Sequence, residues 1–322
     1  MRARRAALAF ALLGLLAAAP GNAAWPEKRI TFVVPAPPGG TMDVMARVVA
    51  AQLSPRLRQP VVVDYRPGGG GALAVQALLD ASADGHTLLF TGSSVLTESP
   101  HVLALRYNPL TDLQPVADLG RAYLLLIAHP AVPAATLSEL IAHAKRNPRK
   151  LSYASYGPGT AAHYAGLIFN RREGIDLQHV PYKGSPPALA DVMAGQVPLM
   201  FDGIVTSLPH IRSGKVKAFA ISSRGRSRLL PQVPTFAELG YPEIDFSNWI
   251  GVAASARMAP ELAATINREL FSLVAAPGVR ERLLELGFEP TPASTPGELA
   301  AMVRAEFERN ARIVKAFNIT FE

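Results

Sequence analysis

Two glycine-bearing loops, one in each half of the chain, carry the residue types best suited to holding a small anion. The first runs from Pro35 to Asp43 and leads into a predicted helix, for which Thr41 or Asp43 is the expected N-cap. Glycine lets the backbone approach a ligand closely, and a helix start offers unpaired N–H groups and about half a positive charge. An ordinary strand-to-helix turn would favour the same residue types. The candidate ligand-binding residues here are Pro38, Gly39, Gly40, Thr41 and Asp43.

The second loop, Tyr156 to Thr160, is built in the same way and adds Gly157, Gly159 and Thr160 to the candidates. Its glycines also fit the dinucleotide fingerprint G-x-G-x-x-A, but Pro158 removes a backbone donor inside that motif and argues against a nucleotide. His163 follows the loop and is a further candidate, although a lone histidine near a helix start is more often a structural hydrogen-bond partner. Two such helix starts, facing each other across a cleft, would suit a carboxylate.

Other polar residues follow predicted strands and are expected near the same cleft. Thr91 and Ser93 carry hydroxyls that can donate to a ligand, and Asp202 ends a later strand. The alternative for Asp202 is a helix cap. For Lys183, in a neighbouring strand-end loop, the alternative is a solvated surface lysine, which is the usual environment of lysine.

Enzyme and metal signatures are missing from the sequence. It holds no G-x-S-x-G, H-E-x-x-H or Walker motif, and the seven histidines are dispersed. It contains no cysteine, which excludes disulfides, thiolate metal sites and cysteine nucleophiles. We therefore predict no catalytic residue, no cofactor and no metal site.

Short apolar strands alternate with helical patterns, which predicts an α/β protein whose ligand lies outside the carboxyl ends of its strands. Ile30–Val34 opens a β-α-β-α-β rhythm that implies a parallel sheet, and a second such unit begins near Leu124. From Pro260 onward the pattern is helical. Crossings near residues 125 and 222 divide the chain into lobe 1 (24–125 plus 223–322) and lobe 2 (126–222).

The N-terminus has the pattern of a secretory signal peptide. Three arginines precede an uncharged run from Ala6 to Ala19, and small residues follow up to Ala23, after which cleavage is expected. The run is shorter than the roughly 20 residues that span a bilayer. Residues 1–23 therefore predict export to the periplasm, and the lack of cysteine excludes a lipoprotein.

Charge gives little sign of a macromolecular partner. The formal net charge of +7 falls to +4 once the three arginines of the predicted signal peptide are removed. The remaining basic residues are scattered and are not interleaved with aromatic residues, so nucleic acid is not an expected partner. A mild positive field would favour anionic solutes.

Taken together, these segments resemble the Bug-type (TctC-like) receptors, the extracytoplasmic solute-binding proteins of tripartite tricarboxylate transporters. The ordered matches are Pro37–Asp43 to the family's first loop, Val61–Gly71 to "VVVENRPGAGG", Ala83–Leu89 to "PDGYTLL", Leu151–Thr160 to "LNYASSGNGT", Val180–Ser185 to "VPYKGS", Gly195–Val197 to "GQV" and Pro231–Glu238 to "PDVPTVAE". Tyr65 and Pro158 stand where the family usually has asparagine. The changes at Tyr156 and Pro158 fall in a ligand loop, so they bear on specificity more than on fold.

The resemblance implies a two-lobed type II periplasmic-binding-protein (venus-flytrap) fold with a helical C-terminal tail. It implies that a small carboxylated solute (a di- or tricarboxylate, an acidic amino acid or an aromatic acid) is captured between the lobes by backbone amides, hydroxyls and ordered waters. The expected partners are that solute and the membrane subunits of a tripartite tricarboxylate-type transporter, and the chain is expected to be a monomer. Two alternatives stay open, a sensory receptor for a membrane kinase and an exported enzyme.

Overall fold

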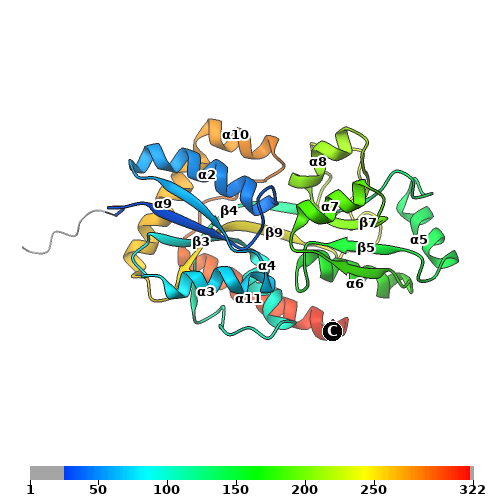
Figure 1. The fold of residues 1–322 in the computed structure, drawn as a ribbon, viewed down its shortest axis with the longest axis horizontal. Coiled ribbons are helices and arrows are strands. Elements are labelled where there is room, and N and C mark those ends of the chain that lie inside the picture. The colour runs from blue at the N-terminus through cyan, green and yellow to red at the C-terminus, as the bar shows by residue number, and fades with distance from the viewer. Residues whose placement is uncertain (1–24, 320–322) are drawn as a thin grey trace, which may run out of the picture.

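The structure, a computed structural model, describes residues 25–319. The predicted signal peptide (residues 1–23) lies outside the described residues. The described chain forms two α/β lobes that lie side by side, with β4 and β9 running between them (Figure 1). Within residues 25–319, no helix combines the length and the apolar character needed to cross a membrane.

The strands form one continuous path of hydrogen-bonded neighbours, β2-β1-β3-β9-β4-β7-β5-β6, and β8 pairs with β4. Their bounds are β1 Ile30–Val34, β2 Val61–Tyr65, β3 Thr87–Gly92, β4 Leu113–Ala128, β5 Ser152–Ser155, β6 Gln178–Pro181, β7 Leu199–Gly203, β8 Lys217–Ile221 and β9 Ser247–Ser255. β1 pairs in parallel with β2 and β3, and β5 pairs in parallel with β6 and β7. Each lobe thus contains the parallel unit that the sequence predicts.

The sheet is not parallel throughout, because β4 and β9 pair antiparallel with their neighbours. The 16-residue β4 pairs antiparallel with β9 in its first part and with β7 and β8 in its last part, so it passes from lobe 1 into lobe 2. The chain leaves lobe 1 along β4 and returns along β9, and this out-and-back path makes the two strands antiparallel. Gly251 lies so close to β4 that an added Cβ would be 1.8 Å from the Ala117 carbonyl oxygen.

Helices cover both faces of the lobe 1 sheet. Successive side chains of β1 point to opposite faces, and both sets are buried. Phe32 points to the face covered by α2 and α9, whereas Val33 points to the face covered by α3 and α11 (Figure 1). The helical bounds are α2 Thr41–Leu57, α3 Ala72–Asp80, α4 Ser93–Thr97, α5 Leu137–Arg146, α6 Ala161–Glu173, α7 Ser185–Met193, α8 Ile204–Arg212, α9 Pro260–Ala275, α10 Pro277–Glu285 and α11 Pro296–Ala316. Short 3-10 turns cover Gly69–Gly71 and Ser99–His101.

The helical tail reaches across both lobes. α11 begins with a capping box between Thr295 and Glu298, and Leu299 and Val303 pack into the lobe 1 core. Ile319, just beyond the helix, packs instead into the lobe 2 core, together with the aromatic residues Phe236, Tyr241 and Phe246 of the return segment. The lobe boundaries at residues 125 and 222 stay a prediction, and this packing attaches much of residues 236–246 to lobe 2.

Candidate ligand-binding site

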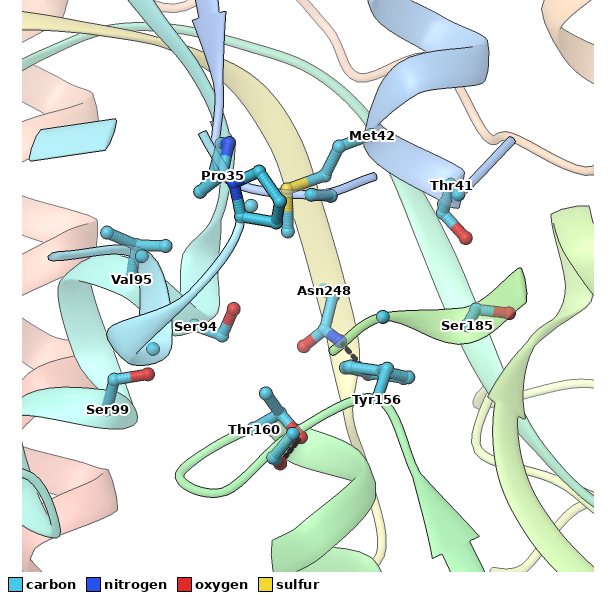
Figure 2. A pocket seen from close by; sticks show the side chains of 18 of the residues that line it. Pro35, Thr41, Met42, Ser94, Val95, Ser99, Tyr156, Thr160, Ser185 and Asn248 are labelled. Atoms are coloured by element: carbon cyan, nitrogen blue, oxygen red, sulfur yellow. Dashed lines mark hydrogen bonds between the residues drawn. The ribbon is translucent and has the colours of Figure 1, made fainter. Parts of the chain in front are cut away.

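A cavity of about 410 Å³ lies between the lobes, at the carboxyl ends of the parallel strands. Figure 2 shows side chains from both lobes converging on it. The wall consists mainly of apolar side chains, glycines and hydroxyl groups, and Lys183 is the one charged residue among the described residues that line it. The lining residues include Pro35, Gly40, Thr41, Met42, Gly92, Ser94, Val95, Ser99, Leu103, Tyr123, Tyr156, Gly157, Pro158, Thr160, Gly184, Ser185, Gly203, Asn248 and Ile250.

In the first loop, Gly40 and Thr41 line the cavity, whereas Pro38 and Gly39 are exposed outside it and Asp43 is buried behind it. Gly40, and not Thr41 or Asp43, is the N-cap of α2, so that prediction is wrong. Asp43 is buried, and its carboxylate accepts hydrogen bonds from the Gly39 N–H at 2.7 Å and the Tyr65 hydroxyl at 2.6 Å. Asp43 therefore holds the loop in shape, and Tyr65 is its hydrogen-bond donor.

At the end of β3, Gly92 and Ser94 face the cavity, and the candidates Thr91 and Ser93 lie behind them. The Ser93 hydroxyl donates to Asn248 Oδ1 at 3.3 Å, and the Asn248 amide donates to the Tyr156 hydroxyl at 3.3 Å. Asn248 thus links the two lobes across the middle of the cavity (Figure 2). The sequence analysis missed it because β9, which carries it, was not predicted.

In the second loop, Gly157 and Thr160 line the cavity but Gly159 does not. Gly159 packs against lobe 1: its carbonyl accepts a hydrogen bond from the Ser99 hydroxyl at 3.0 Å, and an added Cβ would be 2.8 Å from Val102 Cγ2. With a φ of +68°, this position favours glycine. Gly159 is therefore a contact between the lobes.

His163 lies behind this loop and fixes it. Its Nδ1 accepts a hydrogen bond from the Gly159 N–H at 3.2 Å, so its ring proton is on Nε2. Its ring stacks on His179 with centroids 4.4 Å apart, and His179 Nε2 is 2.7 Å from the Ser155 hydroxyl. Burial lowers the pKa of His163 to about 4, and burial together with His163 lowers the pKa of His179 to about 3. Both rings are neutral at pH 7.

This histidine pair predicts a loss of stability in mild acid. As the pH falls below about 6.5, the unfolded chain takes up protons that the folded protein does not accept until about pH 4 and pH 3. Between pH 7.5 and pH 5, we expect each histidine to reduce the free energy of unfolding by about 2 kcal/mol, and the pair by about 4 kcal/mol. Urea denaturation of the wild type and a His163→Gln, His179→Gln variant would measure this. If the free energy of unfolding depended equally steeply on pH in both proteins, the two histidines would not be the source of the acid sensitivity.

Asp202 is fully buried at the end of β7 and does not line the cavity. Its carboxylate accepts hydrogen bonds from the Thr206 hydroxyl at 2.7 Å and the Ser207 hydroxyl at 2.6 Å. Burial raises its pKa, while the nearby hydroxyls of Ser207, Ser185 and Thr206 oppose this rise. Asp202 is not the N-cap of α8, which is Gly203; it binds two hydroxyls in the first turn of α8 and so fixes that turn.

Three helix starts converge at one end of the cavity, with Gly40, Gly184 and Gly203 as the N-caps of α2, α7 and α8. None of these three caps has a side-chain hydrogen bond. The glycines allow the lobes to meet: a Cβ on Gly203 would be 2.8 Å from Thr41 Oγ1, and a Cβ on Gly184 would be 2.4 Å from Pro37. The result is a cluster of N–H dipoles on a wall that itself has no acidic side chain, with the carboxylates of Asp43 and Asp202 buried behind the α2 and α8 starts.

Two α/β lobes that enclose a cavity walled by helix starts, glycines and hydroxyls define a solute-binding protein. The sequence model for the tripartite tricarboxylate transporter family receptor matches residues 45–319, and the chain belongs to this family. It is 37% identical to Protein BugT of Bordetella pertussis, over 95% of this chain and 96% of that protein. This membership confirms that the chain is a solute-binding receptor and not an enzyme.

Solved structures confirm the periplasmic-binding-protein fold. The periplasmic binding protein BugD is 31% identical, with a TM-score of 0.87 over 92% of this chain and all of that one. Rpa4515 of R. palustris, solved with adipate, is 30% identical, with a TM-score of 0.88 over 92% of this chain and 100% of that one. MatC of Rhodopseudomonas palustris, solved with bound malate, is 32% identical, with a TM-score of 0.84 over 90% of this chain and 100% of that one.

Proposed function

We propose that this receptor is exported to the periplasm and captures a small carboxylated solute in the cavity between its lobes. It would then deliver the solute to the membrane subunits of a tripartite tricarboxylate-type transporter. The adipate and malate bound by two of its structural neighbours support a carboxylate ligand. The arginine-led apolar N-terminus supports export.

The observation that carries this proposal is the convergence of the α2, α7 and α8 starts on a wall without acidic side chains. Each start contributes N–H groups and part of a helix dipole, and together they stabilise a negative charge. Gly40, Thr41, Gly157 and Thr160 are the predicted site residues that would touch the solute. The other predicted residues would hold these loops in place: Pro38, Gly39, Asp43, Thr91, Ser93, Gly159, His163 and Asp202.

The lobes touch on both sides of the cavity, as a closed receptor requires. On one side Gly203 meets Thr41, and on the other the Tyr164 hydroxyl donates to the Glu98 carbonyl at 2.8 Å. A solute drives closure only through its preference for the closed state. Release to the membrane partner would then need these contacts to separate by hinge bending.

Thr41 offers a direct test, since it is the first residue of α2 and its side chain lies on the cavity wall (Figure 2). We expect Thr41→Val to weaken the binding of a carboxylate about tenfold, because hydrogen bonds to charged groups contribute about 1.5–3 kcal/mol. Thr41→Asp adds a like charge and should remove measurable binding. Calorimetry with hexanoate, adipate, 4-methylbenzoate and terephthalate would measure both effects.

The matched control is Thr265→Asp, the same change at a half-buried position of α9 that does not line the cavity. It should leave carboxylate affinity unchanged. For the wild type, a bound carboxylate should raise the free energy of unfolding by about 2.7 kcal/mol at a hundredfold excess over its dissociation constant. Carboxylate binding that is equally strong in wild type and Thr41→Asp would overturn the proposed site.

A further inference from the structure

The two ends of the cavity differ in the backbone N–H groups that they offer to a ligand. At the lobe 2 tip, the Gly157 N–H donates to the Ser155 hydroxyl at 3.2 Å and the Gly159 N–H donates to His163 at 3.2 Å. Pro158, between them, has no N–H. Every backbone donor of residues 157–159 is therefore missing or already used.

Two hydroxyls at this end, those of Thr160 and Ser99, are also used by carbonyl groups of this loop. Thr160 donates to the Gly157 carbonyl at 2.7 Å, and Ser99 donates to the Gly159 carbonyl at 3.0 Å. A hydroxyl has a single proton to donate, so neither group can donate to a carboxylate without breaking these bonds. Figure 2 shows both side chains at the same end of the cavity, together with Tyr156.

Tyr156 occupies the remaining space at the start of α6. Its hydroxyl accepts a hydrogen bond from the Asn248 amide at 3.3 Å, and its carbonyl accepts one from the Gly184 N–H at 3.1 Å. Burial raises the pKa of its hydroxyl, while the Asn248 amide and the Ala162 backbone N–H, in the first turn of α6, oppose the rise. The tyrosine oxygen thus lies where a second ligand carboxylate would meet the α6 dipole.

At the opposite end, at the α2, α7 and α8 starts, the Gly184 N–H is used by the Tyr156 carbonyl, and the N-cap glycines have no side chain that could occupy the other N–H groups. Thr41 lies beside these starts. Between the two ends the wall is apolar, with Met42, Val95, Leu103 and Ile250 facing the cavity. An apolar wall disfavours a charged or strongly hydrated group because that group would lose its water contacts.

We propose that Tyr156 and Pro158 make this receptor selective for monocarboxylates with an apolar body, over dicarboxylates of the same length. The inference rests on the proposed function, since it takes the anion to bind at the α2, α7 and α8 starts. The carboxylate lies at those starts, and the apolar body extends along the wall toward the Tyr156 ring.

Calorimetry with two matched pairs tests the selectivity of the wild-type protein. Hexanoate and adipate have the same chain length, and 4-methylbenzoate and terephthalate have nearly the same shape; within each pair only the second ligand has a second carboxylate. We expect the monocarboxylate of at least one pair to bind ten times more tightly or better. Tighter binding of the dicarboxylate in both pairs would overturn the inference and leave the proposed function standing. Binding of none of the four would count against both.

A Tyr156→Ser, Pro158→Asn variant tests the two residues themselves. It restores a backbone donor at position 158 and uncovers the α6 start, so the monocarboxylate-to-dicarboxylate affinity ratio should fall at least tenfold. Because both ligands are measured on the same variant, a general loss of stability cancels in the ratio. Tyr156→Phe removes only the hydroxyl and should give a smaller change in the same direction. An unchanged ratio in the double variant would overturn the assignment to these residues.

Discussion

Replacing Gly159 by aspartate is expected to weaken solute binding at least a hundredfold, which corresponds to about 2.7 kcal/mol. Gly159 has a φ of +68°, and an added Cβ would be 2.8 Å from Val102 Cγ2 and 3.1 Å from the Ser99 Cα of the other lobe. The new side chain would therefore hold the lobes apart. Its charge would also lie next to the cavity. Calorimetry with the tightest-binding carboxylate of the panel would measure the loss.

Gly174→Asp is the matched control for this variant. Gly174 ends α6 with a similar φ of +62°, but an added Cβ would meet no atom within 4 Å. It should show the same backbone strain with unchanged affinity. Circular dichroism should show that both variants are folded. If Gly159→Asp bound the solute as tightly as Gly174→Asp, closure through the Ser99 and Val102 contact would be wrong.

Trp249→Ala should lower the free energy of unfolding by about 3–5 kcal/mol, the range for truncating a large buried aromatic residue. Trp249 is fully buried on β9, among residues from β3 and α11. Its indole N–H donates to Glu306 at 3.1 Å, so truncation also leaves a largely buried carboxyl group without this donor. Urea denaturation would measure the change.

Trp249→Phe gives the matched comparison, because it keeps most of the ring volume and loses the hydrogen bond to Glu306. It should cost less than the alanine variant. A loss below about 1 kcal/mol for Trp249→Ala, with an unchanged denaturant slope, would contradict the central place of β9 in the lobe 1 core.

The sequence predicts best those elements whose local pattern and tertiary environment agree. Ile30–Val34 is a short apolar run because β1 is covered on both faces, and it forms a strand as predicted. The segment Ser247–Ser255 mixes polar, small and apolar residues and has no such pattern. It becomes β9 because the return of the chain between the lobes places it against β3 and β4.

The candidate loops were predicted at the right places in the fold, but the roles of their residues were not. An aspartate in the first turn of a helix resembles an N-cap in sequence, and Asp43 instead reaches back to the Gly39 N–H and to Tyr65 from another strand. Similarly, the Gly159 N–H is used by His163 and is not offered to a ligand. Which amides of a glycine loop stay unpaired depends on such tertiary contacts, and spacing does not encode them.

The central claim is that a carboxylate binds between the lobes at the starts of α2, α7 and α8, and a crystal structure with the tightest-binding acid of the panel tests it most directly. We expect the carboxylate oxygens within hydrogen-bond distance, directly or through one water, of backbone N–H groups near Thr41 and Gly203, with both lobes in contact with the ligand. A ligand carboxylate bound outside this cavity, or held by the Gly157–Gly159 tip alone, would contradict the claim.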